Sequence, residues 1–223
     1  MASAYLDSFG RVWTNAPPLI WCPDAGGPDG NTLIKDAEFG LSLALPPQAK
    51  IHAAMAELDA QARAEDETVS AGFADDDDFY SIVMKASRVL EAAGAEFTMS
   101  GFGNPRWPLD LSYDGSMIIE DLPDFMGDLV DLTDGAVTLH LCGQGVETDL
   151  VFETAGEDLR ITCVSRAPWI DRDIVHHVSE IAVLLMFDEL ARSFALGLEM
   201  MDTEVAGRPP FVSWKRPLTE EGL

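Results

Sequence analysis

Basic residues are scarce in this sequence. Lys and Arg total 14 against 39 Asp and Glu, which gives a formal net charge of −25 over 223 residues. Proteins that bind nucleic acids or anionic membranes contact phosphates through Lys and Arg, so we expect neither kind of partner. The imbalance leaves two explanations open: a surface that keeps the protein soluble, or a surface that attracts a basic partner.

Cysteines and long apolar runs are also few. Cys22, Cys142 and Cys163 are too widely spaced for a disulfide framework, so we interpret them as buried free thiols in a reducing compartment. The N-terminus has no basic segment followed by an apolar one, so no signal peptide is predicted. The longest apolar stretch, Ile181–Phe187, is far shorter than the about 20 residues that cross a bilayer. We therefore expect a cytoplasmic protein.

Familiar catalytic and cofactor motifs are absent. The sequence contains neither of the two glycine-rich phosphate-binding motifs, no G-x-S-x-G nucleophile elbow and no H-E-x-x-H zinc motif. The four consecutive aspartates 75–78 lack the alternation of a calcium-binding EF-hand loop, and we interpret them as a solvated loop that caps the next helix. We therefore expect no cofactor.

Two groups of residues that include histidine are candidates for a metal site or a catalytic site. His176 or His177 could pair with Glu180 as metal ligands on one helix, but no second pair at ligand spacing completes the set, so no metal is predicted. His140 and Cys142 fall on one face of a predicted strand, yet the sequence shows no third group to orient a nucleophile–base pair. No catalytic residue is predicted, and an enzyme with an unrecognised active site stays an alternative.

Hydrophobic periodicity predicts the fold class. Hydrophobic residues make up 47% of the chain, enough for a core, and the length fits a single domain over 1–223. We expect an irregular N-terminal segment at 1–31 with a short strand at Leu19–Cys22, and an extended tail at 203–223. Strands are predicted within 33–45, 97–99, 109–113, 136–142, 146–154 and 159–165. Helices are predicted at 47–64, 79–93, 120–132 and 171–201. The fold class is therefore α+β, with an antiparallel meander near 136–165 packed against several helices, including a long C-terminal one.

The acidic residues are unevenly distributed. Between residues 107 and 158 there are thirteen acids and no Lys or Arg. Four of the aspartates are spaced 3, 4 and 3 residues apart from 121 to 131, which places them on one stripe of a helix. Like charges at this spacing cost about 0.2–0.5 kcal/mol per pair, so the stripe is either a solvated outer face or a surface kept for a partner. The candidate partner-binding residues are Asp121, Asp124, Asp128, Asp131, Asp110, Asp114, Glu147, Asp149 and Trp107, the last because Trp is enriched at interfaces.

Positive charge reappears near the C-terminus. Residues 205–217 contain Arg208, Lys215 and Arg216 and no acid. Two roles are open for this segment: docking onto the protein's own acidic surface, or contacting the partner.

One stretch of sequence carries a resemblance. GAVTLHLCGQGVETDLVFETAGEDLRITCVSR, residues 135–166, followed by a long amphipathic helix, is similar in kind to immunity proteins of bacterial polymorphic-toxin and contact-secretion systems. The acidic charge and the missing catalytic motifs add to the resemblance, which covers roughly the last hundred residues. It implies a cytoplasmic inhibitor that occludes a basic surface or active site of a cognate toxin, a nuclease being one candidate. An adaptor or chaperone for a secreted effector is the alternative, and either a monomer or a homodimer is expected.

Overall fold

The computed structural model describes residues 4–6, 12–14, 38–64, 72–141, 146–156 and 158–215. The predicted strand at Leu19–Cys22, the predicted turn at 143–145, Cys22 and Cys142 lie outside these ranges. The helices are α1 (Gln48–Ala64), α2 (Phe79–Ala92), α3 (Ser116–Val130), α4 (Glu180–Met201) and α5 (Phe211–Trp214), with a π-helical turn η1 (Leu111–Gly115) and a 3-10 turn η2 (Val205–Gly207). The strands are β1 (Ala4–Leu6), β2 (Val12–Thr14), β3 (Gly40–Ala44), β4 (Glu96–Ser100), β5 (Ala136–Leu141), β6 (Thr148–Ala155), β7 (Asp158–Ser165) and β8 (His176–Ser179).

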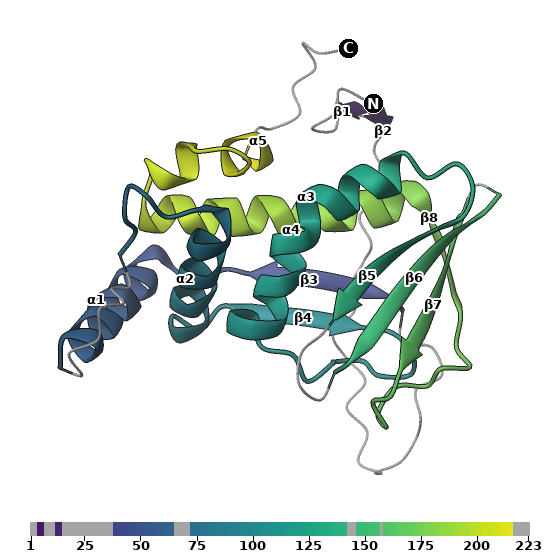
Figure 1. Ribbon diagram of the computed structural model, residues 1–223, viewed down its shortest axis with the longest axis horizontal. Helices are drawn as coiled ribbons and strands as arrows, with labels where there is room; N and C mark the ends of the chain where they lie inside the picture. Colours follow the sequence, from purple (N-terminus) through teal and green to yellow (C-terminus); the bar gives the residue numbers. More distant parts are fainter. Residues whose placement is uncertain are drawn as a thin grey trace.

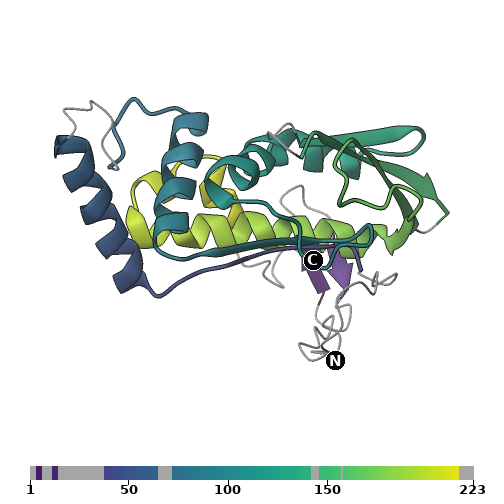
Figure 2. The same cartoon turned by 90° about the horizontal axis from the view of Figure 1, so that it is seen from below.

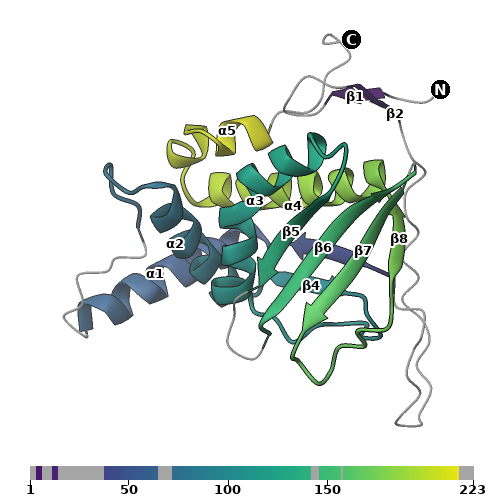
Figure 3. The ribbon, with the colours of Figure 1, turned by 45° about the vertical axis from the view of Figure 1, so that its right-hand side comes forward.

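The architecture is α+β, as predicted. Strands β5 to β8 form one antiparallel sheet in chain order, and β3 pairs with β4 in a second one. Helices α1 and α2 lie at one end of the molecule and the four-stranded sheet at the other (Figure 1). Helix α4 runs alongside the β3–β4 pair and links the two ends (Figure 2). The predicted meander near 136–165 is confirmed, and β8 adds a fourth strand to it (Figure 3).

A continuous apolar core joins these elements. At its centre Phe125 of α3 contacts Phe152 of β6 and Phe187 of α4 edge to face, with ring centroids 5.2 and 4.8 Å apart. Helix α4 packs closely against its other neighbours at Gly197, where an added Cβ would lie 3.0 Å from side-chain atoms of Leu45 and Leu90. These contacts fix the position of α3 relative to the sheet.

The first two predicted helices are confirmed. Helix α2 begins where the Asp78 carboxylate accepts a hydrogen bond from the Ser81 N–H at 2.8 Å, and it ends before Gly94, which has a left-handed φ of +86°. Inside the acidic loop, Asp77 accepts a hydrogen bond from Lys85 Nζ at 2.6 Å. These aspartates therefore order the start of α2.

The predictions around residue 111 were wrong. Residues 109–113 were expected to be a strand and 120–132 a helix with Pro123 in its first turn, but helical structure begins at Leu111 and continues through α3. Two carboxylates explain the early start. Asp110 accepts a hydrogen bond from the Tyr113 N–H at 2.7 Å, and Glu91 of α2 accepts them from the N–H groups of Leu111 and Ser112 at 2.9 and 2.8 Å. Pro123 consequently lies in the interior of α3.

The predicted helix at 171–201 begins later than expected. Residues 176–179 form β8, paired with β7 in the register Leu159↔Val178 and Arg160↔His177, and α4 starts at Glu180. The open edge of β7 provides hydrogen-bond partners that local helical periodicity does not reveal.

The C-terminal tail is not extended where it is described. Residues 205–207 and 211–214 are helical, and Phe211 is fully buried against Phe79 and Trp214. Lys215 Nζ donates to Glu199 at 2.9 Å, and Arg208 donates to the Asp75 carbonyl at 3.4 Å. These two basic residues therefore pair with acidic segments of the chain itself.

Trp107 is a core residue. Its side chain is 2% exposed, its Nε1–H donates to the Gly101 carbonyl at 3.1 Å, and its ring meets that of Trp169 at a centroid distance of 5.1 Å. The structure therefore corrects the prediction that this ring contacts a partner.

Replacing Trp107 with Ala should lower the free energy of unfolding by about 3–5 kcal/mol, because a large buried ring is lost. The matched control is Tyr113→Ala, which removes an aromatic ring that is 51% exposed and should change stability by about 0.5 kcal/mol or less. Urea unfolding followed by circular dichroism measures both. Similar losses in the two variants would contradict the packing described for Trp107.

Candidate functional site

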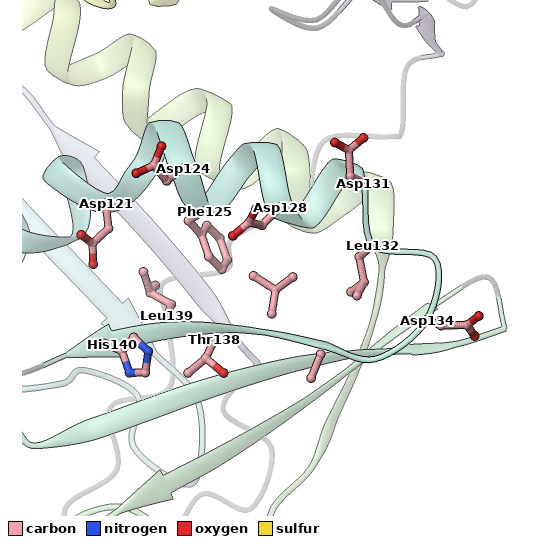
Figure 4. Close-up of a pocket in the computed structure, with 12 residues that line it drawn as sticks. Asp121, Asp124, Phe125, Asp128, Asp131, Leu132, Asp134, Thr138, Leu139 and His140 are labelled. Carbon is pink, nitrogen blue, oxygen red and sulfur yellow. The ribbon is translucent and has the colours of Figure 1, made fainter.

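Helix α3 and strand β5 border a groove with a volume of about 610 Å³ (Figure 4). Its lining is made by one side of α3, the connection that follows the helix, and most of β5. The lining residues are Asp121, Asp124, Phe125, Asp128, Asp131, Leu132, Asp134, Ala136, Val137, Thr138, Leu139 and His140.

The α3 wall of the groove contains the predicted acidic stripe. Asp121, Asp124, Asp128 and Asp131 are all exposed, whereas Leu122, Phe125 and Leu129 on the neighbouring face are buried. The 3-4-3 spacing alone predicted that these four carboxylates share one side of a helix. Figure 4 shows them along α3 above β5. The structure therefore brings four of the nine candidate residues to one groove.

The β5 wall follows the edge of the sheet. Five consecutive residues, 136–140, line the groove. Successive side chains of a strand point to opposite faces, so five consecutive side chains cannot all point into the groove. These residues therefore line the groove through the backbone edge of the strand. Strand β5 is first in the sheet order and pairs with β6 on one side; in the described ranges no strand pairs with its other side.

The groove has charge of one sign. Among the residues that the structure describes, five aspartates line it and no Lys or Arg does. Although Asp121 is exposed overall, partial desolvation raises the pKa of its carboxyl; His140 opposes the shift and the neighbouring Asp124 adds to it. Desolvation, with repulsion from Asp121, likewise raises the pKa of Glu120. Folding therefore disfavours the charged forms of Asp121 and Glu120.

The other acidic candidates lie elsewhere. Asp110 and Asp114 sit at the start of the helical segment, where Asp110 caps η1 and Asp114 accepts a hydrogen bond from the Asp110 N–H at 3.2 Å. Burial raises the pKa of Asp114; the hydrogen bond from the Asp110 N–H opposes this shift, and repulsion from the Asp110 and Glu91 carboxylates adds to it. Asp110 thus stabilises the start of the segment that carries the stripe, whereas the charge of Asp114 is disfavoured there.

Glu147 and Asp149 border a second hollow, which is lined mainly by residues at the start of β6 and the end of β7. Its lining includes the exposed Val164 and two arginines, and Glu147 lies 4.0 Å from Arg166. A hydrogen bond of 2.8 Å joins His140 Nδ1 and Asp149 Oδ1 across the strand pair. Mixed charge distinguishes this hollow from the acidic groove.

The geometry gives little support to catalysis. His140 and Asp149 form a hydrogen-bonded pair, but their side chains are 59% and 47% exposed, and Cys142 lies outside the described residues. Burial raises the pKa of Cys163 to about 12, which keeps this thiol protonated and unreactive at neutral pH. No cluster of three or more metal-ligating side chains occurs in the part of the chain that the structure describes.

His176 has a structural partner. Its Nε2 accepts a hydrogen bond from the Phe102 N–H at 3.0 Å, so this nitrogen is unprotonated in the folded state. Phe102 is fully buried with a φ of +53°, between Gly101 and Gly103, which also have left-handed φ values. The proposed ligand spacing to Glu180 on one helix is lost, since His176 belongs to β8. His176 therefore holds a strained turn in place.

Comparisons with known proteins gave no relative: no protein-family model, no curated protein and no solved structure matches the chain. Among the described helices, none combines the length and apolar character needed to cross a membrane.

Replacing Asp121 with Asn should stabilise the protein at pH 7. A carboxyl whose pKa is raised by folding binds its proton more tightly in the folded state, so its ionisation lowers stability as the pH rises above 3.8. The difference from the wild type should vanish below pH 3.8, where the group is protonated in both states. Urea midpoints from pH 3 to 7 measure this.

The control variant replaces Asp78, whose charge has the opposite effect on stability. Hydrogen bonds from the Ser81 N–H and hydroxyl lower the pKa of Asp78, so its charge stabilises the fold above pH 3.8 and this contribution is lost as the pH falls through the lowered value. Asp78→Ala should therefore destabilise the protein at pH 7. A loss of stability in Asp121→Asn at pH 7 would contradict the cost assigned to ionising Asp121.

A second pH effect follows from His176. Burial lowers its pKa below 6.5, while Glu38 opposes the shift, so the neutral ring is favoured by folding. The stability it contributes is present above pH 6.5 and lost as the pH falls through the lowered folded value. His176→Gln keeps a neutral acceptor for the Phe102 N–H and should remove this loss, whereas His177→Gln, at an exposed neighbour, should retain it. Unfolding curves at pH 7 and pH 5 separate the variants, and equal behaviour would refute the assignment.

Proposed function

We propose that this protein is an acidic binding protein that holds a basic protein partner at the groove between α3 and β5, and that the partner is a cognate bacterial toxin which it inhibits. The single observation that carries the proposal is the lining of the groove, to which the described part of the chain contributes five aspartates and no Lys or Arg. The resemblance of residues 135–166 and the following helix to immunity proteins supports the choice of a toxin.

The physical basis is charge combined with an apolar surface. A groove lined by one sign of charge attracts an oppositely charged partner and orients it during encounter, which raises the association rate by about 10- to 1,000-fold. Leu132 and Val137, both half-buried, contribute exposed apolar atoms to the same groove, whereas Phe125 and Leu139 are already buried in the core. Burying apolar surface slows dissociation, since charges at an exposed rim add little affinity of their own. A toxin that presents a protruding basic segment would fit this groove, and binding there would occlude that part of its surface.

The test is capture of partners from lysate of the source cells by the wild-type protein and two charge-matched variants. Asp124→Lys with Asp128→Lys reverses charge in the groove, whereas Asp75→Lys with Asp76→Lys makes the same change on the exposed loop before α2. We expect a basic protein to be retained by the wild type and the loop variant, released by salt, and lost from the groove variant. With the purified partner, the groove variant should associate at least about tenfold more slowly.

Function is tested by co-expression. A captured toxin should arrest growth when expressed alone, and the wild type should relieve the arrest while the groove variant fails to do so. Equal capture by all three proteins, or equal protection, would refute the proposal. If the partner binds only when unfolded and the complex contains two copies of this chain, as light scattering would show, the adaptor or chaperone alternative replaces the toxin inhibitor.

A further inference from the structure

One wall of the groove is a strand edge whose outward hydrogen-bonding groups have no partner among the described residues. In an antiparallel pair, every second residue of an edge strand directs its N–H and C=O away from the neighbouring strand. Strand β5 pairs only with β6, and no backbone hydrogen bond from the described residues reaches the groove side of Ala136–Leu141. Such an edge is a template for another extended segment.

We infer that the groove takes an extended, basic segment of the partner as a fifth strand beside β5, with its Lys or Arg side chains directed to the aspartates of α3. This inference rests on the proposed function and specifies how the partner binds. Backbone hydrogen bonds to β5 supply affinity, and the aspartates select basic side chains at alternate positions.

The dimensions of the two walls agree with this mode of binding. From Asp121 to Asp131 the stripe extends about 15 Å, at about 1.5 Å per helical residue. The six residues of β5 extend about 20 Å, and side chains on one face of an added strand repeat every 6.6–6.8 Å or so. Three basic side chains at alternate positions therefore span about 13–14 Å, nearly the length of the stripe.

The negative charge of the protein favours a basic segment at the β5 edge over a second copy of the chain. Pairing of two β5 edges would bring two acidic α3 helices together between molecules that each carry a formal charge of −25. Like charges across an interface oppose association, whereas a basic segment neutralises Asp121, Asp124 and Asp128. Partial desolvation of Asp121, which raises its pKa, makes that neutralisation more favourable.

The probe is an eight-residue peptide of alternating Lys and Val, blocked at both ends, tested with the full-length protein. Two further peptides are N-methylated, one at every Lys and the other at every Val. Alternate residues of a strand direct their N–H groups to opposite edges, so one of these forms loses its donors to β5 and the other does not. We expect one form to bind about tenfold or more weakly than the parent, and the other to bind within about threefold of it.

Hydrogen exchange and the charge variants complete the test. The parent peptide should slow exchange of amides within 136–141, and the Asp124→Lys, Asp128→Lys variant should lose binding while the Asp75→Lys, Asp76→Lys variant keeps it. Equal affinity of both methylated forms, with no protection of β5, would overturn strand addition yet leave a charge-based partner site intact. Failure of the parent peptide to bind at low salt, or protection of β5 by self-association, would also overturn strand addition. In each of those cases the lysate capture still decides the proposed function separately.

Discussion

The contacts of Phe125 set the geometry on which the acidic groove depends. This ring packs against Phe152 of the sheet and Phe187 of α4, and it lies on α3 between Asp124 and Asp128 in the sequence. Because helical neighbours diverge in direction by about 100°, burying Phe125 necessarily turns the aspartates toward the rim of the groove. The apolar core thus determines where the charges point, and the distance between the stripe and the edge of β5 follows from aromatic packing.

Helix α3 contains residues that lower its stability and residues that stabilise it. Its first N–H groups are satisfied by Asp110 and Glu91, which favours helix formation. Farther along, Pro123 removes one helical hydrogen bond and the aspartates repel each other. A helix with these defects persists because its buried face is anchored on two sides. Local unfavourable terms of this kind are expected where a surface is retained for binding.

Much of the fold could be predicted from periodicity, because α1 and α2 satisfy their hydrogen bonds locally and the strands of the meander pair with strands next to them in the sequence. The predicted boundaries were wrong where hydrogen-bond partners lie far away in the sequence. Glu91 is 20 residues from the Leu111 N–H that it binds, and β8 depends on the open edge of β7. The stripe on α3 was predictable from its spacing. The β5 edge was not, because which strand ends a sheet depends on the pairing of the whole chain, and Trp107 was misassigned because residue type alone does not report burial.

The turn at 101–103 constrains how this chain can vary. Three successive residues have left-handed φ values, and a Cβ on Gly101 would lie 3.3 Å from both the His176 ring and the Phe39 backbone. Only glycine adopts such conformations at little cost, so an L-amino acid at position 101 or 103 would destabilise the turn. The inverted stereochemistry of a D-residue suits a left-handed φ, so Gly103→D-Ala, made by chemical ligation, should be tolerated better than Gly103→L-Ala. The geometry of this turn therefore tolerates fewer substitutions at 101 and 103 than an exposed acidic surface does.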